Sequence, residues 1–87
     1  MMNTEEYRKF YEMIEEKNNE LRLVIQALTN ASETIKSNMG SDAISCKYAN
    51  ELSEKCTSLT NLAESIDKLI LGLKKEYLDA QDILRNL

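Results

Sequence analysis

The sequence predicts an all-α fold, an antiparallel two-helix hairpin of the coiled-coil type that is expected to pair into a four-helix bundle. Three observations predict it. The 87 residues include no proline and only two glycines, so few positions would break a helix. Apolar residues recur at alternating steps of three and four along both halves. One glycine, Gly40, lies near the middle, where the chain is expected to reverse.

Thr4 is expected to cap the first helix, because its hydroxyl precedes the acidic Glu5 and Glu6, which suit a first turn. We place this helix at 4–37. Its apolar seam is interrupted only by Lys17. The predicted seam consists of Tyr7, Phe10, Ile14, Lys17, Leu21, Val24, Leu28, Ala31 and Ile35.

A stop-and-restart signal follows at 38–41, since glycine suits the residue after a helix and Ser41 or Asp42 can cap the next one. The second helix is predicted at 42–87, and the whole chain, 1–87, forms a single domain. Every position of its seam is apolar or small. These positions are Ala49, Leu52, Cys56, Leu59, Ala63, Ile66, Ile70, Leu73, Tyr77, Ala80, Leu84 and Leu87.

Folding the two seams about Gly40 predicts that residues whose numbers sum to about 80 face each other. Ala31 would meet Ala49, and Lys17 would meet Ala63. In this register residues 77–87 extend past the first helix without a partner in their own chain. Apolar surface that a hairpin leaves uncovered indicates an interface with another molecule. The predicted partner-binding residues are Leu62, Leu69, Leu71, Tyr77, Leu78, Ile83, Leu84 and Leu87.

Composition argues against several functions. The net charge is -4, and the basic residues are dispersed, whereas nucleic-acid binding needs clustered Lys and Arg. No apolar run exceeds three residues, too short to span a membrane, and the polar N-terminal residues do not resemble a signal peptide. We therefore expect no nucleic acid and no membrane insertion. The expected location is the cytoplasm, with any export by a route that needs no signal peptide.

Catalysis is not expected either. The chain has no histidine, which removes the commonest general base and Cys/His zinc sites. Cys46 and Cys56 are ten positions apart on one predicted helix, roughly 15 Å by the helical rise, too far for a disulfide. The glutamates at 12–20 lack the histidines of a di-iron bundle site. We predict no catalytic residue, metal, cofactor or small-molecule substrate.

The plan of the chain resembles the WXG100 (ESAT-6-like) small helical proteins of type VII secretion, and most closely their divergent relatives encoded beside LXG toxins in Gram-positive bacteria. Asn38-Met39-Gly40 occupies the place of the W-x-G turn; the glycine matches, and Asn38 stands where the family has tryptophan. The family also carries a C-terminal export motif, an aromatic residue followed four positions later by an acid. Tyr77, Leu78 and Asp82 approximate it.

The resemblance implies a non-enzymatic adaptor or targeting factor that binds the helical N-terminal region of an LXG toxin and promotes its export. Two alternatives from the residues stay open. The chain could be a homodimer that is itself a WXG100-like secreted substrate, or an unrelated structural coiled-coil module. The sequence leaves the partner's identity undetermined.

Overall fold

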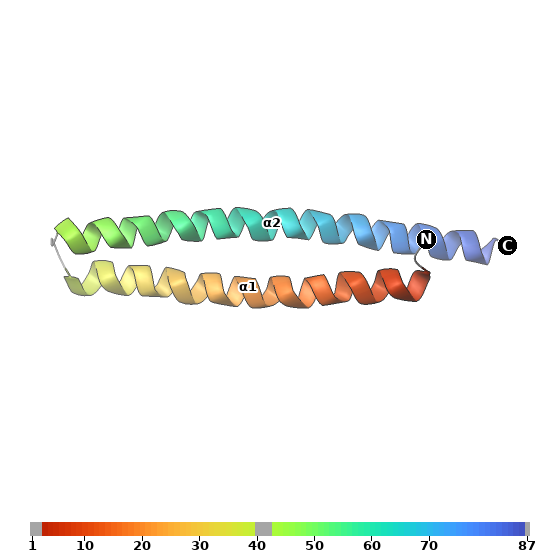
Figure 1. The fold of residues 1–87 in the computed structure, drawn as a ribbon, viewed down its shortest axis with the longest axis horizontal. Coiled ribbons are helices and arrows are strands. Elements are labelled where there is room, and N and C mark those ends of the chain that lie inside the picture. The colour runs from red at the N-terminus through yellow and green to blue at the C-terminus, as the bar shows by residue number, and fades with distance from the viewer. Residues whose placement is uncertain (1–2, 40–42, 87) are drawn as a thin grey trace.

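The computed structural model describes residues 3–39 and 43–86, and the side chains of residues 3–38 and 46–86. It consists of two long helices, α1 (Thr4–Met39) and α2 (Ala43–Arg85), with no strand in the described ranges. The helices run side by side in opposite directions, and α2 continues beyond the start of α1 (Figure 1). The predicted all-α helical hairpin is confirmed.

The predicted end of the first helix at residue 37 is wrong, whereas the predicted start of the second helix at Asp42 lies outside the described residues. Helix α1 continues through Asn38 and Met39, which were predicted to lie in the turn, and α2 begins at Ala43. Gly40, Ser41 and Asp42, on which the turn and cap predictions rested, lie outside the described residues.

The cap of α1 is Asn3 rather than Thr4. The Oδ1 atom of Asn3 accepts a hydrogen bond of 2.9 Å from the backbone N–H of Glu6, and its carbonyl accepts one of 3.2 Å from the N–H of Tyr7. Thr4 is already helical. Asparagine is among the best capping residues because its short amide reaches these unpaired N–H groups.

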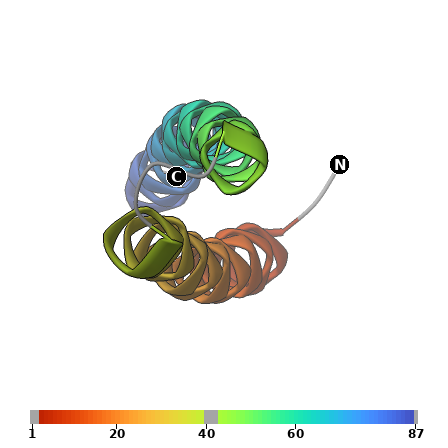
Figure 2. The same ribbon diagram turned by 90° about the vertical axis from the view of Figure 1, so that its left-hand side faces the viewer.

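The molecule is a thin rod, 68 Å long and 16 by 14 Å across. Seen from the end, α1 and α2 sweep sideways in opposite directions, so they cross obliquely along their length (Figure 2). A rod of two helices has no interior beyond their line of contact. The buried apolar residues of the described chain are accordingly few: Ala49, Cys56, Ala63 and Ile70.

These four residues recur every seven positions on α2, which agrees with the seam predicted for that helix. The matching row on α1 is shifted by one residue from the prediction. Phe10 and Val24 were predicted to lie in the seam but are 47% and 53% exposed, whereas Asn18 and Ser32 are buried. We define the central seam by the rows at this spacing: Tyr11, Asn18, Ile25 and Ser32 on α1, with Ala49, Cys56, Ala63, Ile70 and Tyr77 on α2.

Candidate partner-binding surface

The two sides of the central seam differ completely in chemistry. In each helix, the residues four positions after a seam residue lie on one side of it, and those three positions after lie on the other. On the first side every such residue is polar or charged. We call this side the polar flank: Glu15, Arg22, Thr29 and Lys36 on α1, with Ser53, Thr60, Asp67, Lys74 and Gln81 on α2.

Ion pairs and a hydrogen bond join α1 to α2 along the polar flank. Arg22 pairs with Asp67, the ammonium of Lys74 lies 2.9 Å from the carboxylate of Glu15, and Lys36 donates to the hydroxyl of Ser53 at 3.3 Å. The hydrogen bond to Glu15, and then its charge, raise the pKa of Lys74 above its ordinary value. The side chains of the two ion pairs are 42–49% exposed, so each pair adds little stability.

Two buried polar residues complete this arrangement within the seam. Nδ2 of Asn18 donates to the carbonyl of Ala63 at 3.1 Å and to Oδ1 of Asp67 at 2.8 Å. The hydroxyl of Ser32 donates to the carbonyl of Ala49 at 3.0 Å and lies 2.8 Å from that of Ser53. Such short links to a backbone carbonyl require close helices, which the small side chain of alanine permits. The predicted pairs of Lys17 with Ala63 and Ala31 with Ala49 are therefore wrong by one residue.

The opposite side of the seam is mostly apolar. The residues three positions after the seam residues are half-buried there, and the row just outside them, immediately before the seam residues, is exposed and mostly apolar. We call this side the apolar face. Its members are Phe10, Ile14, Leu21, Val24 and Leu28 on α1, with Tyr48, Leu52, Leu59, Leu62, Ile66, Leu69 and Leu73 on α2.

A groove of about 300 Å³ runs along the middle of this face. Both helices contribute to it. Its lining residues are Met13, Ile14, Lys17, Asn18, Leu21, Ile66 and Leu69. Two large lining side chains are half exposed to water, Met13 at 52% and Leu69 at 55%, and Leu62, seven positions before Leu69 on the same edge, is 50% exposed. An apolar surface of this extent on a rod is typical of a protein interface rather than of a solvated face.

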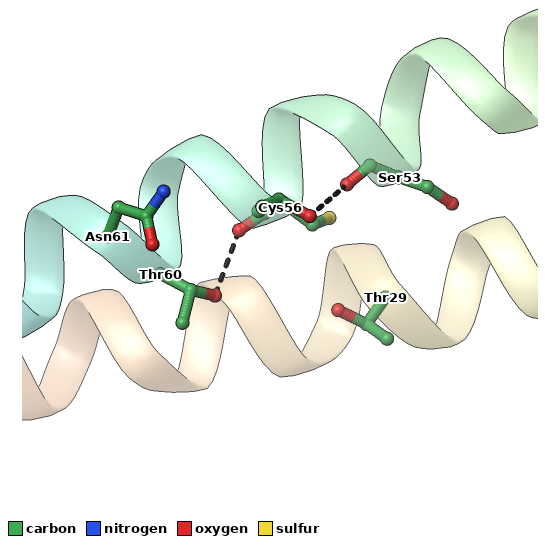
Figure 3. A pocket seen from close by; sticks show the side chains of 6 residues that line it. Thr29, Ser53, Cys56, Thr60 and Asn61 are labelled. Carbon is green, nitrogen blue, oxygen red and sulfur yellow. Dashed lines mark hydrogen bonds between the residues drawn. The ribbon is translucent and has the colours of Figure 1, made fainter.

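A second hollow, of about 330 Å³, lies over the polar flank and is lined by hydroxyl-bearing residues and Cys56 (Figure 3). Two of its hydroxyls donate to carbonyls within α2. That of Thr57 donates to the carbonyl of Ser53 at 3.2 Å, and that of Thr60 to the carbonyl of Cys56 at 2.9 Å. Of its six lining residues, Cys56 alone has a titratable side chain, and it is buried.

Contacts with other residues of the chain continue further toward the C-terminus of α2 than predicted. The ring of Tyr77 meets that of Tyr11 edge to face, with centroids 5.7 Å apart, and its hydroxyl accepts a hydrogen bond of 2.9 Å from Gln81. Ala80 and Gln81 are half-buried, and exposure becomes continuous only from Asp82. The predicted overhang of 77–87 therefore has partners in its own chain for its first residues.

The predicted partner-binding residues fall on different sides of the rod. Leu62 and Leu69 lie on the apolar face. Leu71 and Leu78 follow the seam residues Ile70 and Tyr77 directly, which puts them round the helix beyond the polar flank, and both are exposed.

At the tip, Ile83 and Leu84 are exposed and Leu87 lies outside the described residues. Of the export-signal candidates, Tyr77 is half-buried, while Leu78 and Asp82 are exposed. Leu78 and Asp82, four positions apart, therefore share an exposed side of α2, whereas Tyr77 lies in the seam.

Sequence reasoning placed Phe10 and Val24 in the seam rather than on the exposed edge of the apolar face, and it did not single out Met13, which lines the groove. The sequence does contain a signal for the apolar face. Every residue four positions after a seam residue is polar or charged, which indicates that the apolar face lies on the opposite side of the seam. Reading this signal requires the correct seam on α1.

The other chemical predictions concern cysteines, metals and membranes. Cys56 is buried in the seam and Cys46 is half-buried. Within residues 3–39 and 43–86, no three His, Cys, Asp or Glu side chains gather closely enough to hold a metal ion. In the same ranges neither helix has a stretch apolar enough to cross a membrane.

Comparison with known proteins returns no match to a protein-family model, a curated protein or a solved structure.

Proposed function

We propose that this chain is a non-enzymatic interaction protein of a Gram-positive type VII secretion system, which binds the helical N-terminal region of an LXG toxin with its apolar face and promotes the toxin's export. The system and the toxin are suggested by the resemblance in plan to WXG100-like proteins. The mode of binding is suggested by the side chains of the hairpin.

The observation that carries the proposal is the one-sided apolar face. Seven half-buried residues from two helices form its floor: Ile14, Leu21, Leu28, Leu52, Leu59, Ile66 and Leu73. A second layer of helix packed on them would complete their burial, as in a four-helix bundle. The polar flank offers no comparable surface, because charged pairs already cover it.

The exposed area supports an interface of ordinary size. The chain exposes 6553 Å², whereas a compact monomer of its mass exposes about 5,200 Å². The excess, on the order of 1,300 Å², exceeds the roughly 800 Å² that each partner buries in a standard interface. This excess is spread over all sides of the rod, and the apolar face is the part of it that a partner helix pair would cover.

Co-expression tests the proposal. The chain is produced with the tagged helical N-terminal region of an LXG toxin encoded beside it, and capture on the tag is measured. Leu62→Asp with Leu69→Asp should reduce capture by at least tenfold, because two carboxylates would be buried in the interface. Leu23→Asp is the matched control, since Leu23 is 72% exposed and lies on the outer surface of α1.

Circular dichroism on both variants checks that the helices persist. Undiminished capture by the double variant, with helicity intact, would show that the toxin does not bind the apolar face. Loss of capture by Leu23→Asp as well would indicate a general loss of folding.

A homodimeric four-helix bundle is the second candidate, as a WXG100-like secreted substrate or a structural module. The favouring observation is the size of the apolar face, which a second hairpin would also cover. Sedimentation equilibrium of the purified chain separates the two: a tight dimer that excludes the toxin region supports the homodimer, and a monomer that binds the toxin region supports the adaptor.

A further inference from the structure

Two lysines interrupt the exposed edges of the apolar face. The edge row on α1 is Phe10, Lys17, Val24 and Ala31, and the edge row on α2 over the same length is Tyr48, Lys55, Leu62 and Leu69. Lys17 and Lys55 are the only charged residues in these stretches, and the α2 edge row continues beyond Leu69 with Glu76. Lys17 lines the groove, and Lys55 lies on the other edge of the apolar face, eleven positions before the groove residue Ile66, although the chain as a whole carries a charge of -4.

Neither lysine has a strong partner within the chain. Lys17 lines the groove, and its ammonium lies 3.3 Å from the carboxylate of Glu20, one turn along the same helix. Both of those side chains are mostly exposed, so this contact is weak and readily exchanged. Lys55 is exposed, and no carboxylate of the described residues pairs with it.

We propose that the occupant of the apolar face is a helix whose apolar stripe is bordered by carboxylates, which pair with Lys17 and Lys55. This inference rests on the proposed function, in which that face binds a helical partner. Charges at the rim of an interface select partners and orientation more than they add affinity. The two lysines therefore specify which apolar helix binds and how it is placed.

A second copy of the chain satisfies this requirement poorly. Its edge rows bring the same two lysines, and the nearest carboxylate in them is Glu76, beyond the end of the groove on α2. The net charge also argues for a different preference, since a chain of charge -4 attracts basic helices at long range. The preference of Lys17 and Lys55 for a carboxylate-bordered helix is thus local, and it is opposite to the preference expected from the net charge.

Two synthetic helices test the inference. Both have about 28 residues, roughly four heptads, with the same leucine stripe, and they differ only in carrying Glu or Lys along its borders. Binding to the chain is measured by fluorescence anisotropy at low and high salt. The Glu-bordered helix should bind roughly three- to tenfold more tightly at low salt, as expected for two exposed ion pairs, and this preference should shrink at high salt.

Matched variants isolate the two lysines. Lys17→Glu with Lys55→Glu should reverse the preference. Lys9→Glu with Lys75→Glu makes the same change in net charge on the outer surfaces of α1 and α2, where both lysines are exposed, and should leave the preference intact.

Each outcome is decisive. Equal binding of both helices, or a preference that survives in Lys17→Glu with Lys55→Glu, overturns the inference but leaves the docking face standing. Binding of neither helix by a monomeric chain overturns the docking face as well. A chain that sediments as a dimer and binds neither helix assigns the face to a second copy.

Discussion

Asn18 is the most constrained residue of the hairpin. It is only 4% exposed, and both protons of its amide are donated, to the carbonyl of Ala63 and to the carboxylate of Asp67. Its Oδ1 is buried and receives no hydrogen bond from the described residues. A buried amide that only donates fixes the register of two helices at the cost of an unpaired acceptor.

This geometry predicts a large difference between two neighbouring asparagines. Asn18→Asp replaces the donating amide by a carboxylate that faces the carbonyl of Ala63 and the charge of Asp67. We expect it to lower the free energy of unfolding by about 3 kcal/mol. Asn19→Asp, at an exposed position, should change it by less than about 0.5 kcal/mol. Urea unfolding followed by circular dichroism measures both, and equal effects would contradict the role given to Asn18.

At the scale of the helices, the close approach of α1 and α2 depends on small residues of α2. Ala49 and Ala63 have no exposed surface, and each lies where a side chain of α1 reaches the backbone of α2. A larger side chain at either position would push the helices apart and lengthen these hydrogen bonds.

Ala63→Leu should therefore destabilise the hairpin by about 2 kcal/mol through overpacking, although leucine and alanine are both good helix formers. Ala27→Leu is the control, because Ala27 lies on the exposed side of α1. Thermal unfolding of the two variants gives the comparison. If Ala63→Leu were as stable as the control, the seam would have room that the structure does not show.

The same packing explains which parts of the helices could be predicted from the sequence. The α2 seam is apolar or small at every position, so its periodicity alone located it. On α1 the strongest apolar pattern, with Phe10, Val24 and Ala31, belongs partly to the edge of the apolar face. The true seam contains Asn18 and Ser32, whose polarity hid them, and their burial depends on carbonyls of the other helix.

The candidate site was predictable only in part for the same reason. Leu62 and Leu69 were identified as surplus apolar residues on α2, whose seam was correct. Their counterparts on α1 were assigned to the core, since a one-residue shift moves a row from the seam to its edge. The distinction between polar flank and apolar face needs both seams aligned, and periodicity in one helix does not supply it.

At the scale of the whole molecule, the C-terminal part of α2 divides into a segment that packs on α1 and a tip that does not. Tyr77 still contacts α1 through Tyr11, whereas residues 82–86 are exposed throughout. The last turns of α2 thus depend on helix propensity alone, and an isolated helix end of this length is marginal.

Two truncations separate these parts. Ending the chain after Gln81 should change the free energy of unfolding by less than about 0.5 kcal/mol, whereas ending it after Glu76 also removes the aromatic pair and should cost at least about 1 kcal/mol. Urea titrations check the stabilities. If removal of residues 82–87 alone destabilised the hairpin as much as the longer truncation, the tip would have to pack on its own chain.

Capture of the toxin region by the shorter truncation adds a functional measurement. If the exposed tip contributes to binding, capture should fall while stability is retained, because Ile83 and Leu84 are lost. Unchanged capture would confine the partner to the apolar face.

The one-sidedness of the hairpin also limits how far assembly can proceed. A rod with apolar faces on two opposite sides can associate without limit, because each added molecule exposes another apolar face to the next. Here the Arg22 and Asp67 pair and its neighbours occupy the second side, so a complex would present a charged flank there, with no second continuous apolar face, once the first side is filled. Growth would then stop at a closed particle of fixed stoichiometry, and filaments would not form.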